Sequence, residues 1–328
     1  MAALKHISII IPEGDCSITH IEATHQIMSS VNGLLQSLGK SPLFEVQLVG
    51  IHNTPQIKKG LYAVYPDILA ADLQETDLII IPAIQGDIQK SLELNTIWLD
   101  WILKHYKKGA EVASFCLGSF LLASTGLLNG RQCTTHWTAA ESFKSAFPEI
   151  DLLPDKIMTD EGGIYTSGGA LSFQNLIIYL IEKYAGRDTA ILASKMFMID
   201  IDRNSQSPFI IFKAQKEHKD EPISKAQEFI ENNLQNKLSV DQLANMVAIS
   251  RRNFERRFKK ATSNSILEYI QRVRIEAAKK DLETSALHIN EVMFKVGYSD
   301  AKAFRSIFKK ITGLAPVEYR SKYRYEGN

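Results

Sequence analysis

The chain has 328 residues, and because a domain commonly takes roughly 100–200 residues, this length favours two domains. Hydrophobic residues make up 45% of the chain and charged residues 23%, which excludes disordered, collagen-like and coiled-coil proteins. No apolar run approaches the roughly 20 residues that cross a bilayer, and Lys5 and His6 interrupt any signal peptide. The cysteines Cys16, Cys116 and Cys133 have no metal-type spacing and favour a reducing, cytoplasmic location.

The net charge of +1 hides an asymmetry along the chain. Residues 222–328 hold 20 Lys and Arg against 12 Asp and Glu, a balance of +8, whereas residues 1–221 hold 18 against 25, a balance of −7. A basic C-terminal part is the electrostatic footprint of nucleic-acid binding. The charge distribution therefore predicts a nucleic-acid-binding module joined to a mildly acidic domain with another role.

The first 200 residues alternate short β-rich runs with helix-like segments. The runs are HISIIIP at 6–12, FEVQLVG at 44–50, DLIIIPA at 77–83 and EVASFC at 111–116. The helix-like segments lie at 18–38, 94–108, 170–184 and 187–199. Continuous apolar strands separated by helices indicate a parallel sheet covered on both faces, so residues 1–200 are predicted to form an α/β domain.

Residues 201–221 break this pattern, since they are polar and charged around one apolar patch at 209–212. We interpret them as an interdomain linker that is partly docked. Residues 222–328 contain no convincing strand, and they are predicted to form an all-α domain.

This helical part contains an internal repeat, FERRFKKAT at 254–262 and FRSIFKKIT at 304–312. Each copy follows a short amphipathic segment, at 239–247 or 289–296, and a three-residue turn. Ser239 and Gln242 have the spacing of a capping box. Two short helices around a tight turn predict a helix-turn-helix unit, and the repeat predicts two of them.

The segment 266–283 between the two copies has no Gly or Pro and favours a helix. Its 18 residues would span roughly 27 Å at the rise of an α-helix. Successive major-groove faces of DNA lie roughly 34 Å apart, so this helix could hold two recognition helices on one face of the duplex.

The first recognition helix separates an apolar face from a polar one. Phe254 and Phe258 lie four residues apart on one face, which is predicted to be core. Arg252, Glu255 and Arg256 share a different face in the first two turns, where recognition helices meet base edges. Arg pairs with guanine and Glu accepts from cytosine, so this face is predicted to read bases.

The second copy follows the same plan, with Phe304 and Phe308 in the core. Its outward residues are Ala301, Lys302, Arg305 and Ser306. Phosphate contacts are predicted for the remaining basic residues of both helices, Arg257, Lys259, Lys260, Lys309 and Lys310. The alternative is a solvated charged face on an ordinary helical bundle, which fits the repeat and the charge of +8 less well.

The tail GYSDAKAFRSIFKKITGLAPVEYR at 297–320 resembles the signature of AraC-type transcription regulators, and the likeness covers about 222–325. The resemblance implies seven helices, two helix-turn-helix units per chain and binding to double-stranded promoter DNA. It places the family's base-contact positions on Arg252, Glu255 and Arg256 and on Ala301, Lys302 and Arg305. Ala301 departs from the common polar choice, so the second helix is expected to read fewer bases.

In the first domain, SFCLGS at 114–119 follows the strand from Glu111 and enters a predicted helix at 119–124. Strand, cysteine, glycine and helix describe a nucleophile elbow. The helix dipole favours the thiolate of Cys116, burial opposes it, and His136 could act as its base. On this basis Cys116 is predicted to be the most reactive of the three cysteines. The alternative is that Cys116 is a small buried residue.

Residues 114–137 and 165–186 also resemble the PfpI/ThiJ class of amidotransferase-like domains, in the version fused to AraC-type domains, over roughly 6–200. The resemblance implies a flavodoxin-like sandwich. The class usually has an acidic residue near the cysteine, where this chain has His20 with Glu22 nearby, and Leu117 follows the cysteine in place of a polar residue. We therefore interpret Cys116, His136 and His20 as remnants of a catalytic site.

A metal held by His20, Cys116 and His136 is a further alternative, although no metal and no cofactor are expected. Cys16 and His25 are predicted to be surface or packing residues, and Cys133 to be core.

The favoured hypothesis is a cytoplasmic transcription regulator whose amidotransferase-like domain senses a small molecule, dimerises, or does both. Its expected partners are promoter DNA, an unidentified effector, a second copy of the chain and RNA polymerase, with no membrane. The rival is a cysteine-dependent hydrolase or amidase with a DNA-binding tail.

Overall fold

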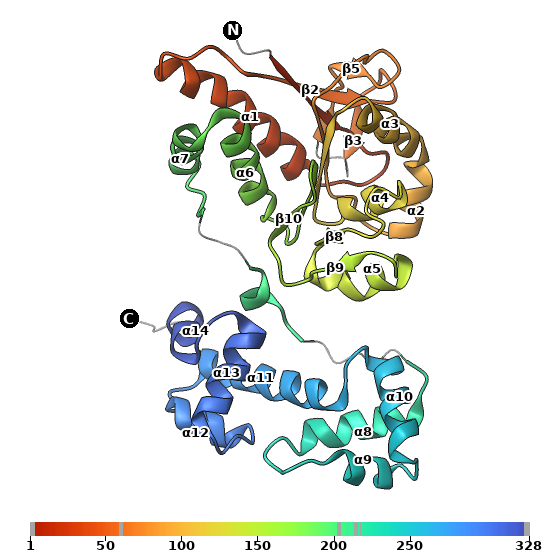
Figure 1. Cartoon of the computed structure of the whole chain (residues 1–328), viewed down its shortest axis with the longest axis vertical. Coiled ribbons are helices and arrows are strands. Elements are labelled where there is room, and N and C mark those ends of the chain that lie inside the picture. Colours follow the sequence, from red (N-terminus) through yellow and green to blue (C-terminus); the bar gives the residue numbers. More distant parts are fainter. Residues whose placement is uncertain (1–3, 59–61, 202–204, 213–215, 217, 325–328) are drawn as a thin grey trace. The chain divides into compact units, whose positions relative to one another are not determined.

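The computed structural model describes residues 4–58, 62–201, 205–212, 216 and 218–324. The chain divides into two compact units, Met1–Gln206 and Ser207–Asn328. Figure 1 shows the first as an α/β unit and the second as a helical unit. None of the described helices combines the length and apolar character needed to cross a lipid bilayer.

A seven-stranded sheet forms the centre of the first unit (Figure 1). Neighbouring strands run parallel, except for β10, which is antiparallel to β11 at one edge. In sheet order the strands are β10 (Met158–Asp160), β11 (Ile164–Ser167), β7 (Glu111–Phe115), β6 (Leu78–Ile81), β1 (Lys5–Ile10), β2 (Phe44–Gly50) and β5 (Ile68–Leu69). The central strands β6 and β7 are buried almost throughout, which is why they are continuously apolar.

Helices cover both faces of the sheet and enclose one hydrophobic core on each side (Figure 1). One face carries α1 (Ile18–Ser37), α6 (Phe173–Ala185) and α7 (Arg187–Met196). The other face carries α2 (Ile88–Leu94), α3 (Thr96–Lys107), α4 (Gly118–Ser124) and α5 (Ala140–Ala146). The predicted α/β sandwich is therefore confirmed.

Several details differ from the sequence prediction. The helix expected over 94–108 is present as α3, and a further helix that was not expected, α2, precedes it. Asn95 separates the two, since its side chain donates to the carbonyls of Glu13 and Ser91 at 3.0 and 2.8 Å. Two small ladders lie outside the main sheet and were not expected. They pair β3 (Gln56–Lys58) with β4 (Tyr62–Val64) and β8 (Gln132–Cys133) with β9 (Asp151–Leu152).

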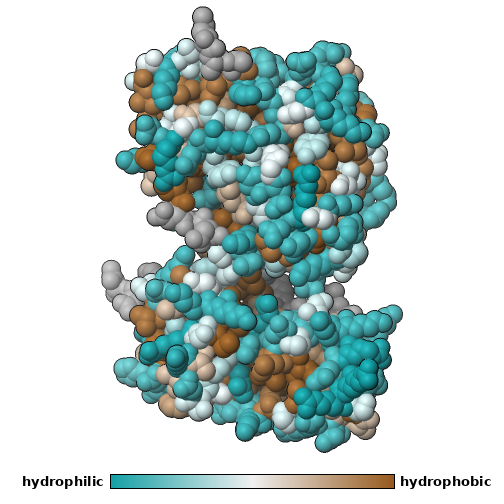
Figure 2. Space-filling model, in the orientation of Figure 1, coloured by the Kyte–Doolittle hydropathy of each residue, from teal (hydrophilic) through white to brown (hydrophobic). Residues whose placement is uncertain are grey.

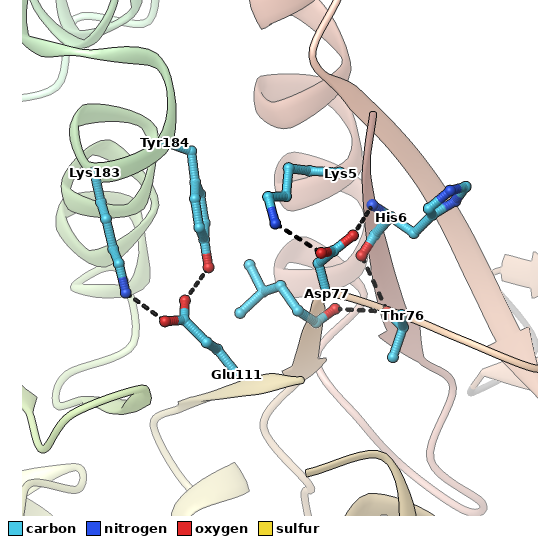
Figure 3. A network of polar contacts seen from close by, with 8 residues as sticks. Lys5, His6, Thr76, Asp77, Glu111, Lys183 and Tyr184 are labelled. Carbon is cyan, nitrogen blue, oxygen red and sulfur yellow. Dashed lines mark hydrogen bonds and ion pairs between the residues drawn. The ribbon is translucent and has the colours of Figure 1, made fainter. Parts of the chain in front are cut away.

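Polar contacts close the amino ends of the strands, as Figure 3 shows. Lys5 at the start of β1 pairs with Asp77, which directly precedes β6, at 2.7 Å. Glu111 at the start of β7 accepts hydrogen bonds from Lys183 and Tyr184 of α6. Since ligands of parallel α/β sheets bind outside the carboxyl ends of the strands, a ligand site is expected at the opposite ends of these strands.

The second unit contains seven α-helices and no strand in the part that the structure describes. They are α8 (Glu221–Asn232), α9 (Val240–Met246), α10 (Arg251–Thr262), α11 (Ile266–Thr284), α12 (Ile289–Lys295), α13 (Ala301–Thr312) and α14 (Pro316–Tyr323). Two hydrophobic cores form, one around Phe254, Phe258 and Tyr269 and the other around Phe304 and Phe308. The predicted all-α domain and its duplication are confirmed.

The segment between the units is docked where the structure describes it. A short 3-10 helix, η2 (Ser207–Phe209), begins the second unit, and the Tyr323 hydroxyl donates to the carbonyl of Pro208 at 3.3 Å. The ammonium group of Lys279, almost fully buried, donates to the carbonyl of Ile210 at 2.7 Å. The backbone of the apolar patch expected at 209–212 is therefore docked on the helical unit, whereas the Phe209 and Ile211 side chains are exposed.

This docking gives a prediction about fragments. A fragment 207–328 should be more stable than a fragment 215–328 by about 2–3 kcal/mol, because the shorter one leaves the buried Lys279 without a carbonyl partner and removes the Phe212 ring from Tyr269. Urea unfolding of both fragments, followed by circular dichroism, measures the difference. Equal unfolding midpoints would show that the docked segment adds no stability.

Candidate nucleic-acid interface and nucleophile elbow

The first helix-turn-helix unit consists of α9, a tight turn and α10. The Ser239 hydroxyl accepts from the backbone of Gln242 at 3.1 Å, which is one half of the expected capping box; the reciprocal bond is absent among the described contacts. Ala248 adopts a left-handed backbone conformation in the turn, with φ of 54°. The next residue, Ile249, donates back to the carbonyl of Ala244 at 3.1 Å and closes the turn.

α10 presents its polar face to solvent as the sequence predicts. Phe254 and Phe258 are fully buried, with ring centroids 5.7 Å apart. Arg252, Glu255 and Arg256 are exposed on the other side. Where Figure 1 labels α10, Figure 2 shows a strongly hydrophilic surface. The helix can therefore present these three side chains to a ligand without disturbing the core.

The exposed face of α10 is held together by weak contacts. Arg251 pairs with Glu255 and with Asp241, each at 3.1 Å, and Arg256 donates to the Asn253 side chain at 2.9 Å. Exposed ion pairs of this kind contribute little to stability, so a phosphate or a base edge can compete for the same side chains.

Arg257 differs from the other basic residues of α10. Its guanidinium group donates two hydrogen bonds, of 2.9 and 2.6 Å, to Asp220, the residue that caps α8. The hydrogen bonds from Arg257 hold the pKa of the Asp220 carboxyl below its usual range. Arg257 therefore joins α8 to α10, and the phosphate contact predicted for it is better assigned to Lys259 and Lys260, which are exposed.

The turn of the second unit depends on Gly297. Its φ is +85°, and a Cβ at this position would lie 2.1 Å from the carbonyl oxygen of Leu234, so any side chain would displace the backbone there. α13 begins beyond the turn, with the Asp300 carboxylate accepting from the backbone of Ala303 at 2.6 Å. The tight turn expected from the repeat is therefore present, and it requires glycine because a side chain at position 297 would clash with the Leu234 backbone.

α13 repeats the arrangement of α10. Phe304 and Phe308 are buried, and Lys302, Arg305, Ser306, Lys309 and Lys310 are exposed. Ala301 is half-buried and packs against the second core, so it offers little surface at the start of the helix. α11 joins the two units; its 19 residues span about 28 Å, close to the length expected.

The nucleophile elbow lies at the carboxyl end of β7. Cys116 follows the strand directly, adopts a left-handed φ of 53° and precedes α4, which begins at Gly118. A Cβ on Gly118 would lie 2.7 Å from the carbonyl oxygens of Ile81 and Pro82, so only glycine lets the helix approach β6 this closely. The predicted order of strand, cysteine, glycine and helix is therefore present, and the structure adds that the cysteine backbone is strained.

The thiol of Cys116 is not activated in this environment. The residue is only 7% exposed, and burial raises the pKa of the thiol to about 11, against a small lowering by the Leu117 backbone. Burial thus outweighs the helix dipole, which moves a pKa by less than about one unit. Cys133 is buried at the end of β8, where burial raises its pKa further, to about 12; the third cysteine, Cys16, is buried too.

His136 lies in the segment expected but makes other contacts. It caps η1 (Trp137–Ala139), its Nδ1 accepting from the backbone of Thr138 at 3.2 Å and lying 2.7 Å from the Thr138 hydroxyl. Burial lowers the pKa of the imidazole, so it is neutral at pH 7. Among the contacts described, His136 bonds to Thr138 and none joins it to Cys116, so the nucleophile–base pair stays a prediction.

His20 lies under the elbow, with both ring nitrogens occupied by backbone groups. Nδ1 accepts from the backbone N–H of Ala83 at 3.1 Å, so Nε2 carries the proton and donates to the carbonyl of Ala170 at 2.9 Å. Desolvation lowers the pKa of His20, more than the bond to Ala170 raises it. His20 is therefore neutral and links the backbone of Ala83 to that of Ala170, an arrangement that we call a neutral clamp. Glu22 is exposed, so it does not replace the acidic residue that the PfpI/ThiJ class usually has near the cysteine.

The metal alternative gains no support from this arrangement. The residues that the structure describes contain no group of three or more His, Cys, Asp and Glu side chains placed to hold a metal ion. His20, Cys116 and His136 are thus not brought together as a ligand set.

Comparisons with known proteins agree with both halves of this description. The sequence profile of a helix-turn-helix domain matches residues 243–322, and that of the DJ-1/PfpI family matches residues 32–183. The chain joins a DJ-1/PfpI domain to an AraC-type helix-turn-helix domain. Both resemblances inferred from the sequence are confirmed.

Individual relatives match across both domains. The HTH-type transcriptional regulator GbdR of Pseudomonas aeruginosa is 26% identical over 266 residues, 78% of this chain and 69% of that protein. The regulator GlxA of Rhizobium meliloti is 26% identical over 232 residues, 69% of this chain and 71% of its own. A solved structure of a candidate transcriptional regulator from Vibrio parahaemolyticus covers 59% of this chain and 99% of its own, with a TM-score of 0.53 and 25% identity.

The DJ-1/PfpI domain also contains polar residues near Cys116 that sequence reasoning missed. The Thr135 hydroxyl donates to the carbonyl of Cys116 at 3.1 Å and accepts from Ser119 at 2.7 Å. The Gln206 side chain donates to the carbonyl of Thr135 at 2.9 Å. Thr135 lies in the motif that carries the PfpI resemblance and precedes His136, which was a local signal; nothing local marks Gln206, 71 residues from Thr135.

Proposed function

We propose that this protein is a sequence-specific transcription regulator that binds promoter DNA, and that its DJ-1/PfpI domain senses a small molecule and pairs two copies of the chain. The observation that carries the proposal is the duplicated helix-turn-helix geometry. Each recognition helix buries two phenylalanines and exposes basic residues on its opposite face. The relatives GbdR and GlxA, which match most of this chain, are named HTH-type transcriptional regulators.

The proposal assigns base reading to Arg252, Glu255 and Arg256 of the first unit and to Ala301, Lys302 and Arg305 of the second. It assigns phosphate contacts to Lys260 and Lys309, which are exposed further along each helix. Ala301 could contact only a thymine methyl, so the first unit would supply most of the sequence preference.

The proposal excludes turnover at Cys116. A thiol with a raised pKa, a neutral His136 held by Thr138 and a His20 with no available ring nitrogen support this reading. A mass-spectrometric screen of candidate substrates with wild type and Cys116→Ala tests it. A product formed by wild type and lost in Cys116→Ala would favour the rival, a cysteine-dependent hydrolase or amidase.

The DNA-binding part is tested by two substitutions on one helix. Genome-wide footprinting first supplies a cognate site. Arg256→Ala should then weaken binding to that site by about 1–3 kcal/mol and relax the preference at one base pair, because an Arg bidentate to guanine reads a base edge. Fluorescence anisotropy on the cognate site and its single-base variants measures both effects.

Lys260→Ala is the matched control, since it removes one positive charge from the same exposed helix. It should weaken binding to all sequences alike and reduce the salt dependence of binding. If Arg256→Ala lowered the affinity for cognate and random DNA equally, Arg256 would be a phosphate contact.

The remaining partners follow from this proposal. A regulator of this kind acts in the cytoplasm, where promoter DNA and RNA polymerase are available. The effector binds near the carboxyl ends of the strands, around the elbow, because ligands of parallel α/β sheets bind there.

A further inference from the structure

The last residue of the DJ-1/PfpI domain inserts its side chain into that domain. Gln206 is 1% exposed, although it belongs to a segment that links two domains. Its Nε2 donates to the carbonyl oxygens of Thr135 and Lys156 at 2.9 Å each and to the Thr134 hydroxyl at 3.2 Å. We call these three acceptors the amide slot. A linker residue is normally solvated, so this burial indicates a specific docking function.

The slot is shaped for this side chain. A Cβ on Gly168 would lie 2.2 Å from Nε2 of Gln206, so the absence of a side chain there makes room for the carboxamide. The backbone also holds the segment in register, since Gln206 donates to the carbonyl of Asp155 at 2.8 Å and the Ser205 hydroxyl donates to the same carbonyl at 2.9 Å.

The amide slot is connected to the elbow through a single residue. Thr135 accepts from Gln206 with its carbonyl and donates to the carbonyl of Cys116 with its hydroxyl. Cys116 has a strained backbone at the site where the effector is proposed to bind. A ligand that shifts the Cys116 peptide would therefore shift the carbonyl on which Gln206 depends.

The residues that follow Gln206 are held by the DNA-binding domain. The hydroxyl of Tyr323, in the last helix, donates to the carbonyl of Pro208, and Lys279 of α11 donates to the carbonyl of Ile210. α11 is the helix that joins the two helix-turn-helix units. Only one residue, Ser207, separates Gln206 from the first of these contacts.

The Gln206 side chain is not fully hydrogen-bonded in the amide slot. The side-chain oxygen of Gln206 is buried and has no hydrogen-bond donor within the described part of the chain. An unpaired buried acceptor destabilises the docked state, which places it closer in free energy to a released state.

We propose that Gln206 is an intramolecular latch: its carboxamide in the amide slot ties the linker to the elbow, and its release by an effector changes DNA binding. The part of the proposal that concerns DNA rests on the proposed function, whereas the latch itself is a property of the first domain. This gives the experiment two separate readouts.

The first readout is hydrogen exchange of the segment 205–206 in the full-length protein, where the backbone N–H of Gln206 donates to the carbonyl of Asp155. Gln206→Glu keeps the shape but turns a carboxylate oxygen toward three acceptors, and Gln206→Ala removes the side chain. Both should raise exchange of this segment at least about tenfold, since three hydrogen bonds are lost. Thr135→Val removes the hydroxyl that donates to Cys116 and accepts from Ser119, keeps the carbonyl that Gln206 uses, and should raise exchange about fivefold. Gln132→Ala, at an exposed glutamine of β8, should leave it unchanged.

The second readout is the affinity for the site recovered by footprinting. We expect the affinity for this site to shift in the same direction, by about fivefold or more, in Gln206→Glu, Gln206→Ala and Gly168→Ala. The affinity of the control Gln132→Ala should stay within about twofold of wild type. Circular dichroism confirms folding, and the two Gln206 variants decide the matter if Gly168→Ala does not fold. Unchanged exchange in both Gln206 variants overturns the proposal. Faster exchange in these variants also overturns it if their affinity for DNA is unchanged, or if it shifts in opposite directions in the two variants. If wild type binds no specific site, the proposed function fails, and hydrogen exchange alone then decides the latch.

Discussion

At pH 7 iodoacetamide should alkylate Cys116 about 30-fold more slowly than an exposed cysteine of the same chain. Burial raises the pKa of the thiol to about 11, so the thiolate fraction at pH 7 is about 300-fold smaller than for an ordinary cysteine. The higher intrinsic nucleophilicity of a more basic thiolate recovers about tenfold of this loss. Limited access to a buried sulfur slows the reaction further. Peptide mapping after timed labelling measures the rate.

The reference is Ser142→Cys, which places a cysteine on the exposed surface of α5 in the same domain. The rate at Cys116 should rise about tenfold per pH unit and level off only near pH 11, whereas the reference should level off near pH 8.5. Cys133, with the higher pKa, should react more slowly than Cys116. His136→Ala should change nothing, because His136 bonds to Thr138. A rate at Cys116 that levels off below pH 8 would restore the activated thiol and the catalytic alternative.

The architecture was predictable because it follows from local patterns. Continuous apolar runs placed β6 and β7 in the middle of a covered sheet, and the repeated phenylalanines fixed which faces of α10 and α13 are buried. The misses have long-range causes. The helix α2 was not expected, and it is separated from α3 by Asn95, whose side chain bonds to Glu13, 82 residues earlier. The strand β10 is stabilised by pairing with β11, and its three residues carry no strand pattern of their own.

The nucleophile elbow also shows that a property set by long-range contacts cannot be predicted from a local motif. The position of Cys116 between strand and helix was predictable, because the glycine two residues later belongs to the same local motif. The state of its thiol was not, because it depends on how deeply neighbouring elements bury it. Likewise, the sequence placed His20 near the cysteine, but its role depends on Ala170, 150 residues away. Arg257 shows this in the DNA-binding domain, where its partner Asp220 lies on another helix.

Replacing His20 should cost the DJ-1/PfpI domain about 2–5 kcal/mol of stability at pH 7. His20→Ala removes both ring hydrogen bonds and leaves the buried N–H of Ala83 and the carbonyl of Ala170 without these partners. It also removes the ring that packs on Phe115 and Phe173. Urea unfolding followed by near-ultraviolet circular dichroism measures the loss. His25→Ala on the same helix is the control, and it should cost much less because its half-buried ring makes none of these contacts.

The pH dependence separates this clamp from simple packing. Desolvation lowers the pKa of His20 in the folded state below the value of about 6.5 expected for an unfolded chain. Between these two values the unfolded state binds a proton that the folded state does not, so the wild-type domain loses stability as the pH falls below about 6.5. In His20→Ala this contribution disappears, and its deficit relative to wild type should shrink from pH 7 toward pH 5. A deficit that stays constant over this range would mean that His20 has the same pKa in the folded and unfolded states, and the neutral clamp between Ala83 and Ala170 would be wrong.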